Sequence, residues 1–208
     1  DVNTPGISFT LTGNDTIIAH FEEVIPDYNL TINAQPDGAG SISLNGADIT
    51  TALPYTGTYA EGTEITLSAT PQTGFTFAYW ETGGTILLPN PQQSTITLAL
   101  TGNETITAHF EPIVFEITLT NANPNAGTVT VNGTQVSNWP YTITVGYGET
   151  INLEALAAQG FEFASWTLNG TTQTAATLSV TALENATIAI NFSAIVVPPP
   201  PPPAEINC

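Results

Sequence analysis

The chain has 208 residues, with no Lys or Arg against 18 Asp plus Glu, for a formal net charge of −18. Without cationic side chains it cannot neutralise phosphate groups, so the composition argues strongly against binding to nucleic acid or to anionic lipid. No stretch reaches the ~18 apolar residues that a membrane-spanning helix needs, and a single cysteine, Cys208, excludes an internal disulfide.

The first 26 residues repeat the sequence of a later segment. Thr12–Glu22 reads TGNDTIIAHFE, and Thr101–Glu111 reads TGNETITAHFE. We therefore interpret residues 1–26 as the last two strands of a preceding repeat, and the sequence as a fragment of a longer chain.

Alternation predicts strands over 8–12 and 16–21, with Ile17, Ala19 and Phe21 facing a core. An isolated two-stranded hairpin is marginal in water. We therefore expect missing upstream sequence, or strands of another copy, to complete it.

Residues 27–113 form the first full repeat. An Asn45-Gly46 pair between two alternating runs is a strong hairpin signal, because both residue types tolerate positive φ. The proline- and glycine-containing loop 81–93 differs between the copies and is expected to be the most variable surface. Strands are predicted around 30–32, 41–44, 47–51, 64–69, 75–80, 94–100 and 104–110.

Residues 114–195 repeat the same order of motifs. The segments Gly74–Trp80 and Gly160–Trp166 both read Gly-Phe-x-Phe-x-x-Trp, and 166 − 80 gives a spacing of 86 residues. Because the two Phe residues share a parity that the Trp does not, we expect a bulge or burial on both faces. The proposed core positions of the repeat are Phe75, Phe77, Trp80, Phe110, Phe161, Phe163, Trp166 and Phe192.

These patterns predict an all-β fold, a tandem array of small β domains with two full repeats and part of a third. Residues 196–208 contain six consecutive prolines, which favour an extended, semi-rigid linker. A docking motif for an aromatic groove is the alternative interpretation of this tail.

A strand Gly-Thr-x-Ile-x-Leu, then Gly-Phe-x-Phe-x-x-Trp, then a strand ending Ala-x-Phe, resembles the divergent InlB-type B-repeats of bacterial surface proteins. The resemblance covers both repeats and the opening fragment. It implies a secreted or cell-surface protein, commonly a large adhesin, in which the repeat is a spacer or binding module. It implies no catalytic residues. The second repeat departs from the pattern at Asn191, where the other copies have His20 and His109.

Candidate ligand and metal sites are sparse. His20 and His109 are the only residues that can form side-chain ion pairs with the acids, and as metal ligands they are a weak signal. The aromatic segments could form a carbohydrate platform, but their repetition favours a role in the core. Calcium between repeats is an open alternative for the acidic residues near the two joins, which are Glu22, Glu23, Asp27, Glu111 and Glu116.

Several Asn-x-Ser/Thr triplets offer acceptors for N-glycosylation. Asn14, Asn103 and Asn185 occupy the same turn of the repeat and are the expected sites if the chain is glycosylated. Most such triplets are expected to be unmodified in a bacterial protein.

The expected function is a non-catalytic, extracellular stalk, spacer or fibre-forming segment of a bacterial surface adhesin. No cofactor is expected, and the expected partners are neighbouring repeats, further copies of the chain or a surface ligand. The alternatives are a module that binds carbohydrate or a host protein through loops 81–93 and 167–174, and an accessory part of a secreted enzyme.

Overall fold

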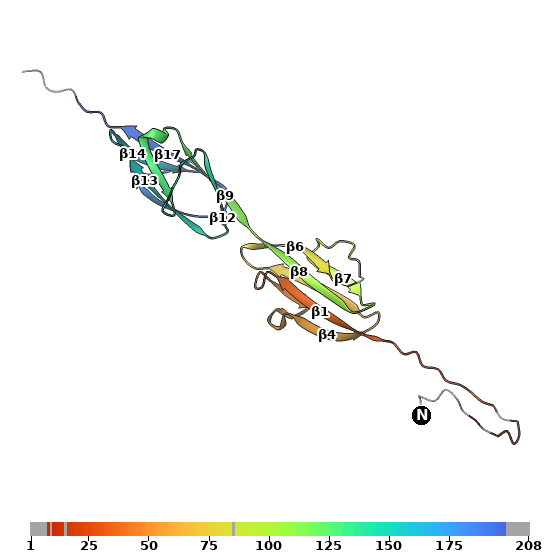
Figure 1. The fold of residues 1–208 in the computed structure, drawn as a ribbon. Helices are drawn as coiled ribbons and strands as arrows, with labels where there is room; N and C mark the ends of the chain where they lie inside the picture. The colour runs from red at the N-terminus through yellow and green to blue at the C-terminus, as the bar shows by residue number, and fades with distance from the viewer. Residues whose placement is uncertain (1–7, 9, 15, 85, 199–208) are drawn as a thin grey trace, which may run out of the picture.

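The computed structural model describes residues 8, 10–14, 16–84 and 86–198, and it contains two β-sandwich repeats that follow one another along the chain (Figure 1). The expected all-β class is confirmed. The strands of repeat 1 are β1 (Asp27–Gln35), β2 (Gly40–Leu44), β3 (Ala47–Asp48), β4 (Tyr55–Ala60), β5 (Glu64–Pro71), β6 (Phe75–Thr82), β7 (Thr95–Ala99) and β8 (Glu104–Pro112), with a short 3-10 turn η1 (Thr50–Ala52).

Repeat 2 has the same order of strands with one addition. The added strand is β15 (Thr171–Gln173), which pairs with the end of β14. The other elements are β9 (Val114–Asn121), η2 (Pro124–Ala126), β10 (Gly127–Val131), β11 (Thr134–Gln135), β12 (Tyr141–Gly146), β13 (Thr150–Ala157), β14 (Phe161–Leu168), β16 (Thr177–Thr181) and β17 (Ala186–Ala194).

Each repeat consists of two sheets. In repeat 1 the strand orders are β4-β1-β8-β6 and β3-β2-β5-β7. In repeat 2 they are β12-β9-β17-β14-β15 and β11-β10-β13-β16. The matching orders show that the sequence repeat is also a structural repeat.

The first and last strands of each repeat are parallel neighbours. β1 pairs in parallel with β8, and β9 pairs in parallel with β17, whereas the remaining strand pairs are antiparallel. The chain therefore enters a repeat at one end and leaves it at the other. A strand of nine residues advances about 30 Å, so serial copies extend in one direction, as Figure 1 shows.

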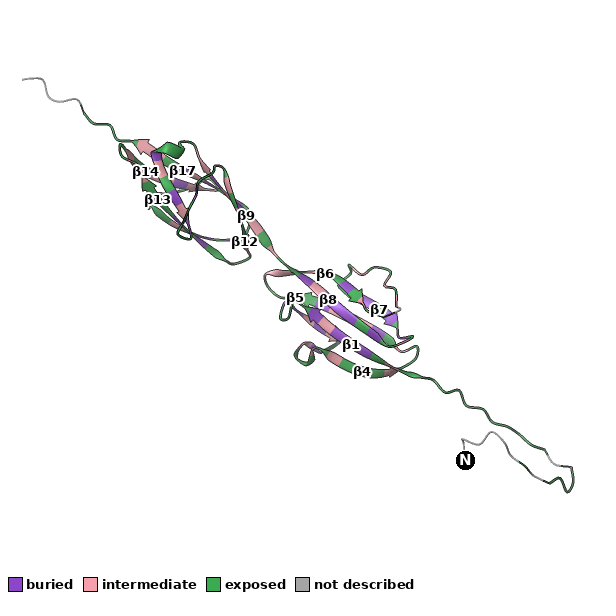
Figure 2. Cartoon of the chain, in the orientation of Figure 1, coloured by how far each residue is buried: buried purple, intermediate pink, exposed green. Residues whose placement is uncertain are grey.

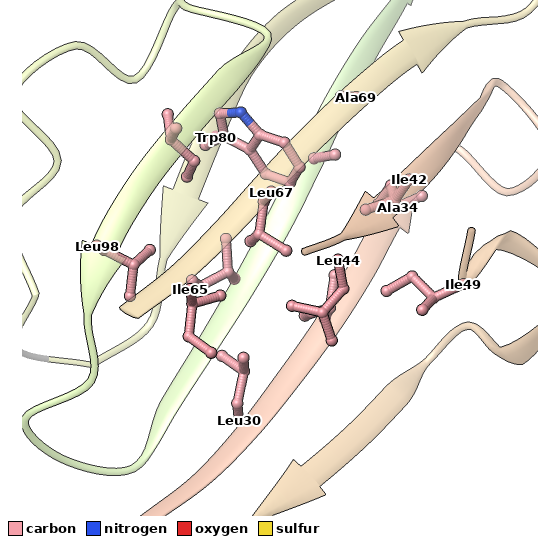
Figure 3. Packing of buried hydrophobic residues seen from close by; sticks show 14 of the residues in the cluster. Leu30, Ala34, Ile42, Leu44, Ile49, Ile65, Leu67, Ala69, Trp80 and Leu98 are labelled. Carbon is pink, nitrogen blue, oxygen red and sulfur yellow. The ribbon is translucent and has the colours of Figure 1, made fainter. Parts of the chain in front are cut away.

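Each sandwich has its own apolar core between its two sheets (Figure 2). Figure 3 shows the core of repeat 1, where Leu30 from one sheet and Ile65 and Leu67 from the other have no exposed surface. Trp80 closes the same core and is 2% exposed, while Trp166 in repeat 2 is fully buried. Alternating apolar residues on each strand supply this burial.

The predicted Asn45-Gly46 turn is present, and the same turn recurs at Asn132-Gly133 in repeat 2. Asn45 and Gly46 have φ of 48° and 82°, and Asn132 and Gly133 have 50° and 79°. Two consecutive positive φ values match the turn twist that joins antiparallel strands tightly. A third Asn-Gly turn, Asn169-Gly170, joins β14 to β15.

The odd parity of the aromatic motif is resolved by a bulge. The register of β6 against β8 shifts between Phe77 and Tyr79, and that of β14 against β17 shifts between Phe163 and Ser165. The extra residue turns Trp80 and Trp166 onto the core side. Each Trp then packs beside the Phe three positions earlier, with ring centroids 5.6 and 5.3 Å apart.

Three expectations about strands are wrong. The described residues within 8–26 form no strand, and Phe21 is 92% exposed, because the rest of the expected core is absent around it. The strand expected over 47–51 ends at Asp48 and gives way to η1. Conversely, the structure has a strand, β4, where the sequence predicts none. Gly57 interrupts the alternation of apolar and polar residues in this segment.

Candidate functional site

The join between the repeats is a single residue. β8 ends at Pro112 and β9 begins at Val114, so only Ile113 lies between them. The Ile113 backbone N–H donates to the Gly74 carbonyl of repeat 1 at 2.8 Å. The Ile113 carbonyl accepts from the Tyr147 N–H of repeat 2 at 2.9 Å. One residue is therefore bonded to both repeats.

The start of repeat 1 and the end of repeat 2 each have one of the two hydrogen bonds found at the Ile113 join. At the start of repeat 1, the Glu61 N–H donates to the Pro26 carbonyl at 2.8 Å, matching the Tyr147 to Ile113 bond. At the end of repeat 2, the Ile195 N–H donates to the Gly160 carbonyl at 2.9 Å, matching the Ile113 to Gly74 bond. The junction geometry thus recurs with the period of the repeat.

The Tyr147 ring of repeat 2 lies close to Gly74 of repeat 1 at the join. Gly74 has φ of 89°, and a Cβ added there would lie 3.7 Å from the Tyr147 ring. Tyr147 in turn lies beside Phe115, with ring centroids 6.3 Å apart. The two hydrogen bonds of Ile113 and the closeness of the Tyr147 ring to Gly74 restrict rotation about Ile113. Sequence reasoning missed this site; its signal was the short distance along the chain between Phe110, which ends the Ala-x-Phe motif, and Val114, where repeat 2 begins.

On the outer face of repeat 1, His109 Nε2 lies 2.8 Å from Glu81 Oε2, and this contact is an ion pair when the imidazole is protonated. The His109 ring also stacks on Tyr79 at a centroid distance of 4.5 Å. Ion pairs in this chain were expected only through histidine, and this pair fits that expectation. Asn191, which replaces the histidine in repeat 2, instead donates through Nδ2 to the hydroxyls of Ser165 and Thr167.

A buried carboxylate anchors the long loop of repeat 1. Glu104 is 4% exposed, and its Oε1 accepts from the backbone N–H groups of Gly84 at 2.5 Å and Thr105 at 3.0 Å. Its Oε2 accepts from Ile86 N–H at 3.2 Å. The loop after β6 is thus tied to the start of β8. In repeat 2 the equivalent residue is Ala186, and the long loop is absent there.

Two hydrogen-bonded groups have shifted pKa values. Hydrogen bonds to Asp48 from the Thr50 hydroxyl and then the Thr50 backbone lower the pKa of that exposed carboxyl. Burial and then the hydrogen bond with Tyr55 raise the pKa of Tyr59 to about 12. Both hydrogen bonds are local, and among the described residues neither group belongs to a cluster of His, Cys, Asp or Glu side chains that could hold a metal ion.

The candidate glycosylation, histidine and core residues predicted from the sequence lie in different parts of the structure and do not form one site. Asn103 and Asn185 each accept through Oδ1 from the first strand of their repeat, from the N–H groups of Asn29 and Glu116 at 2.8 and 2.9 Å. Asn14 lies in the exposed, strand-free segment, as does His20. Of the eight proposed core positions, Trp80, Trp166 and Phe110 are buried and the others are partly buried; these are Phe75, Phe77, Phe161, Phe163 and Phe192.

The acidic residues near the joins do not gather. Across residues 8–84 and 86–198, apart from residues 9 and 15, no three His, Cys, Asp or Glu side chains are grouped in a way that could hold a metal ion. Cys208 and the prolines from 199 onward lie outside the described residues. No helix in the described part of the chain is long and apolar enough to cross a membrane.

Comparison with known proteins gives one family and several distant structures. The family model for the divergent InlB B-repeat domain matches residues 28–114 and 117–196. A search of curated proteins found no match.

Among solved structures, the Bacillus anthracis TIE protein is similar at 11% identity and a TM-score of 0.43, over 80% of this chain and 34% of that one. The T-13 major pilin of Streptococcus pyogenes is 9% identical with a TM-score of 0.39, over 83% of this chain and 98% of that one. The pilus adhesin SpaC of Lactobacillus rhamnosus GG is 10% identical with a TM-score of 0.35, over 83% of this chain and 32% of that one.

Proposed function

Because the chain belongs to the divergent InlB B-repeat domain family, we propose that it is a non-catalytic stalk or spacer of a bacterial surface protein. In this role the repeats hold a binding or anchoring element away from the cell. A surface role without catalysis is what membership of this family supports in general; the stalk is the specific proposal.

The observation that carries the proposal is the bonding of Ile113 to both repeats. A flexible tether would have a longer, polar, unbonded linker. Here the connecting residue continues one strand into the next, and each of its backbone hydrogen bonds contributes about 0.5–1.5 kcal/mol. Together with parallel entry and exit strands, this junction favours a stiff, directional array.

The composition supports the same role. A surface with no Lys or Arg has no trypsin cleavage sites, which suits a chain exposed outside the cell. Its stability depends on apolar cores and strand pairing, since the described residues contain one side-chain ion pair.

Distance measurements between spin labels test the stiffness of the junction. Labels on Glu64→Cys and Glu154→Cys, both exposed strand positions, are introduced together with Cys208→Ser. We expect a narrow distance distribution for the natural junction. Insertion of Gly-Ser-Gly-Ser between Ile113 and Val114 is the matched control and should broaden it. Equal widths for the two proteins would contradict a stiff stalk.

Surface exposure needs a separate test. Proteinase K applied to intact cells of the source organism is expected to degrade the chain, while a cytoplasmic marker survives. Protection of the chain until the cells are lysed would overturn the surface role.

A further inference from the structure

The segment before repeat 1 is two residues longer than the join before repeat 2. The repeated sequence TGNxTIxAHFE places Phe21 at the position of Phe110. Leu30 and Ile117 have the same register against the last strands of their repeats, so these two positions are equivalent as well. From Phe21 to Leu30 the chain advances 30 − 21 = 9 positions, and from Phe110 to Ile117 it advances 117 − 110 = 7.

The two hydrogen bonds made by Ile113 are divided between two residues in the longer segment. Ile113 and Ile195 each lie three positions after the Phe of the last strand, and each N–H donates to the Gly of an aromatic motif. The equivalent residue before repeat 1 is Val24. The carbonyl that accepts from repeat 1, through the N–H of Glu61, is instead that of Pro26. Because proline has no N–H, Pro26 cannot be bonded to both neighbours as Ile113 is.

The start of repeat 1 is acidic where the start of repeat 2 is apolar. By strand register, Asp27 corresponds to Val114 and Glu61 to Tyr147. The Tyr147 ring is the group that lies close to Gly74 across the Ile113 join. Asp27 and Glu61 are both exposed, and the chain has no Lys or Arg to pair with them. The start of repeat 1 therefore lacks the aromatic surface that repeat 2 presents to its predecessor.

The two additional residues also increase the reach of the segment. In extended conformation they advance the chain by about 7 Å, whereas side chains are in contact only within about 4.5 Å. A contact like that between Tyr147 and Gly74 would not form across this distance. Among the described residues, 23–25 are exposed and make no backbone hydrogen bond, so repeat 1 holds the segment only from Pro26 onward.

We propose that residues 23–26 form a flexible joint between repeat 1 and a repeat closed by residues 16–21, in contrast to the stiff join at Ile113. The inference rests on the proposed function, because the joint would articulate the stalk. Repeats 1 and 2 then pivot together as one unit about the start of repeat 1. The stalk bends at this joint and stays straight at Ile113.

Moving the longer segment into the Ile113 join tests the joint in the full chain. Pro112-Ile113 is replaced by Glu-Val-Ile-Pro, the sequence of residues 23–26, together with Tyr147→Glu. In the matched control, Pro112-Ile113 is replaced by Glu-Val, the sequence of residues 23–24, and Tyr147 is kept. The control thus has the natural length and a valine that can make both bonds of Ile113. Neither change enters an apolar core, so both proteins should keep the far-UV circular dichroism of the parent.

Distances are measured between spin labels at Glu64→Cys and Glu154→Cys with Cys208→Ser, in the parent and in both variants. We expect narrow distributions for the parent and the control, and a broader one for the chain with the longer segment. A longer-segment chain as narrow as the parent would overturn the joint. A control as broad as the longer-segment chain would also overturn it, because the added length would then not be the cause. A broad distribution in the parent would instead overturn the stalk, and with it the contrast between the two kinds of join.

Discussion

At the scale of single residues, repeat 1 contains a tyrosine pair that repeat 2 lacks. Tyr55 and Tyr59 lie on the same face of β4, and their hydroxyl oxygens are 2.8 Å apart across Gly57. In repeat 2, Val145 stands where Tyr59 does, so this hydrogen bond is not part of the common fold. Its consequences can be tested without disturbing the architecture.

The raised pKa of Tyr59 makes the stability of repeat 1 sensitive to alkaline pH. Its pKa is about 12 in the folded protein and about 10 in the unfolded chain. The stabilising contribution is therefore complete below pH 10 and is lost as the pH rises towards 12. Tyr59→Phe should remove this part of the decline between pH 10 and 12, at a cost of about 0.5–1.5 kcal/mol near neutral pH. Denaturant unfolding at pH 8, 10 and 12 measures both effects, and identical pH profiles in the two proteins would contradict the assignment.

Two equivalent glycines make room for the last strand of each repeat. A Cβ on Gly127 would lie 2.5 Å from the Phe192 ring and 2.6 Å from the Leu156 carbonyl oxygen. Gly40 has the same relation to Phe110 and to the Thr70 carbonyl. Backbone atoms cannot move aside as a side-chain tip can, so overpacking here costs about 1–3 kcal/mol.

Gly127→Ala should therefore lower the free energy of unfolding of repeat 2 by about 1–3 kcal/mol, measured by denaturant titration. Gly13→Ala is the control, since a Cβ there has nothing within 4 Å, and it should change stability by less than about 0.5 kcal/mol. A Gly127→Ala protein as stable as the parent would show that the Phe192 ring and the strand can shift at little cost.

At the scale of elements, the two repeats differ most in the connection after the aromatic strand. In repeat 2 this connection is the short hairpin β14–β15, closed by Asn169-Gly170. In repeat 1 it is a longer loop, held by Glu104 and by a bond from the Trp80 N–H to the Pro91 carbonyl. The proline-rich loop expected to vary is thus anchored at defined points.

Glu104→Ala should release this loop. The N–H groups of Gly84, Ile86 and Thr105 would lose their shared acceptor, at a total cost of about 1–3 kcal/mol. Ala186 shows that alanine is compatible with the strand at this position. Hydrogen exchange should accelerate across residues 83–94 while β1 and β5 stay protected. Uniformly faster exchange across repeat 1 would instead mean that Glu104 supports the whole sandwich.

How far the sequence predicts each element depends on where the determining interactions lie. Asn45-Gly46 and the aromatic motif encode a turn and a bulge locally, so both could be predicted. The segment 16–21 has the same strand pattern as β8, yet forms no strand, because pairing depends on neighbours that the pattern does not contain. The junction at Ile113 was not predictable from side-chain type, since its hydrogen bonds are made by backbone atoms.

At the scale of the whole molecule, the chain combines separate apolar cores with charge of almost one sign. The two core clusters share no residue, so each repeat supplies its own apolar stabilisation. The junction couples them through a few contacts, as expected for an array with nearest-neighbour interactions. Strong negative charge keeps such a chain soluble, but it opposes compact folding through self-repulsion.

This imbalance predicts that salt stabilises the protein. Two like charges 10 Å apart in water repel by about 0.4 kcal/mol, and 0.15 M salt shortens the Debye length to about 8 Å. The chain has 18 acidic residues that repel one another, whereas His109–Glu81 is the only attractive pair among the described side chains that salt would weaken. Screening by salt therefore removes far more repulsion than attraction. The free energy of unfolding at pH 7 should rise by more than about 0.5 kcal/mol between 0.01 and 0.5 M NaCl. Urea titrations measure the change, because urea adds no ions, and Glu81→Gln should keep the full increase. A fall in stability with salt would mean that attractive electrostatics stabilise this fold.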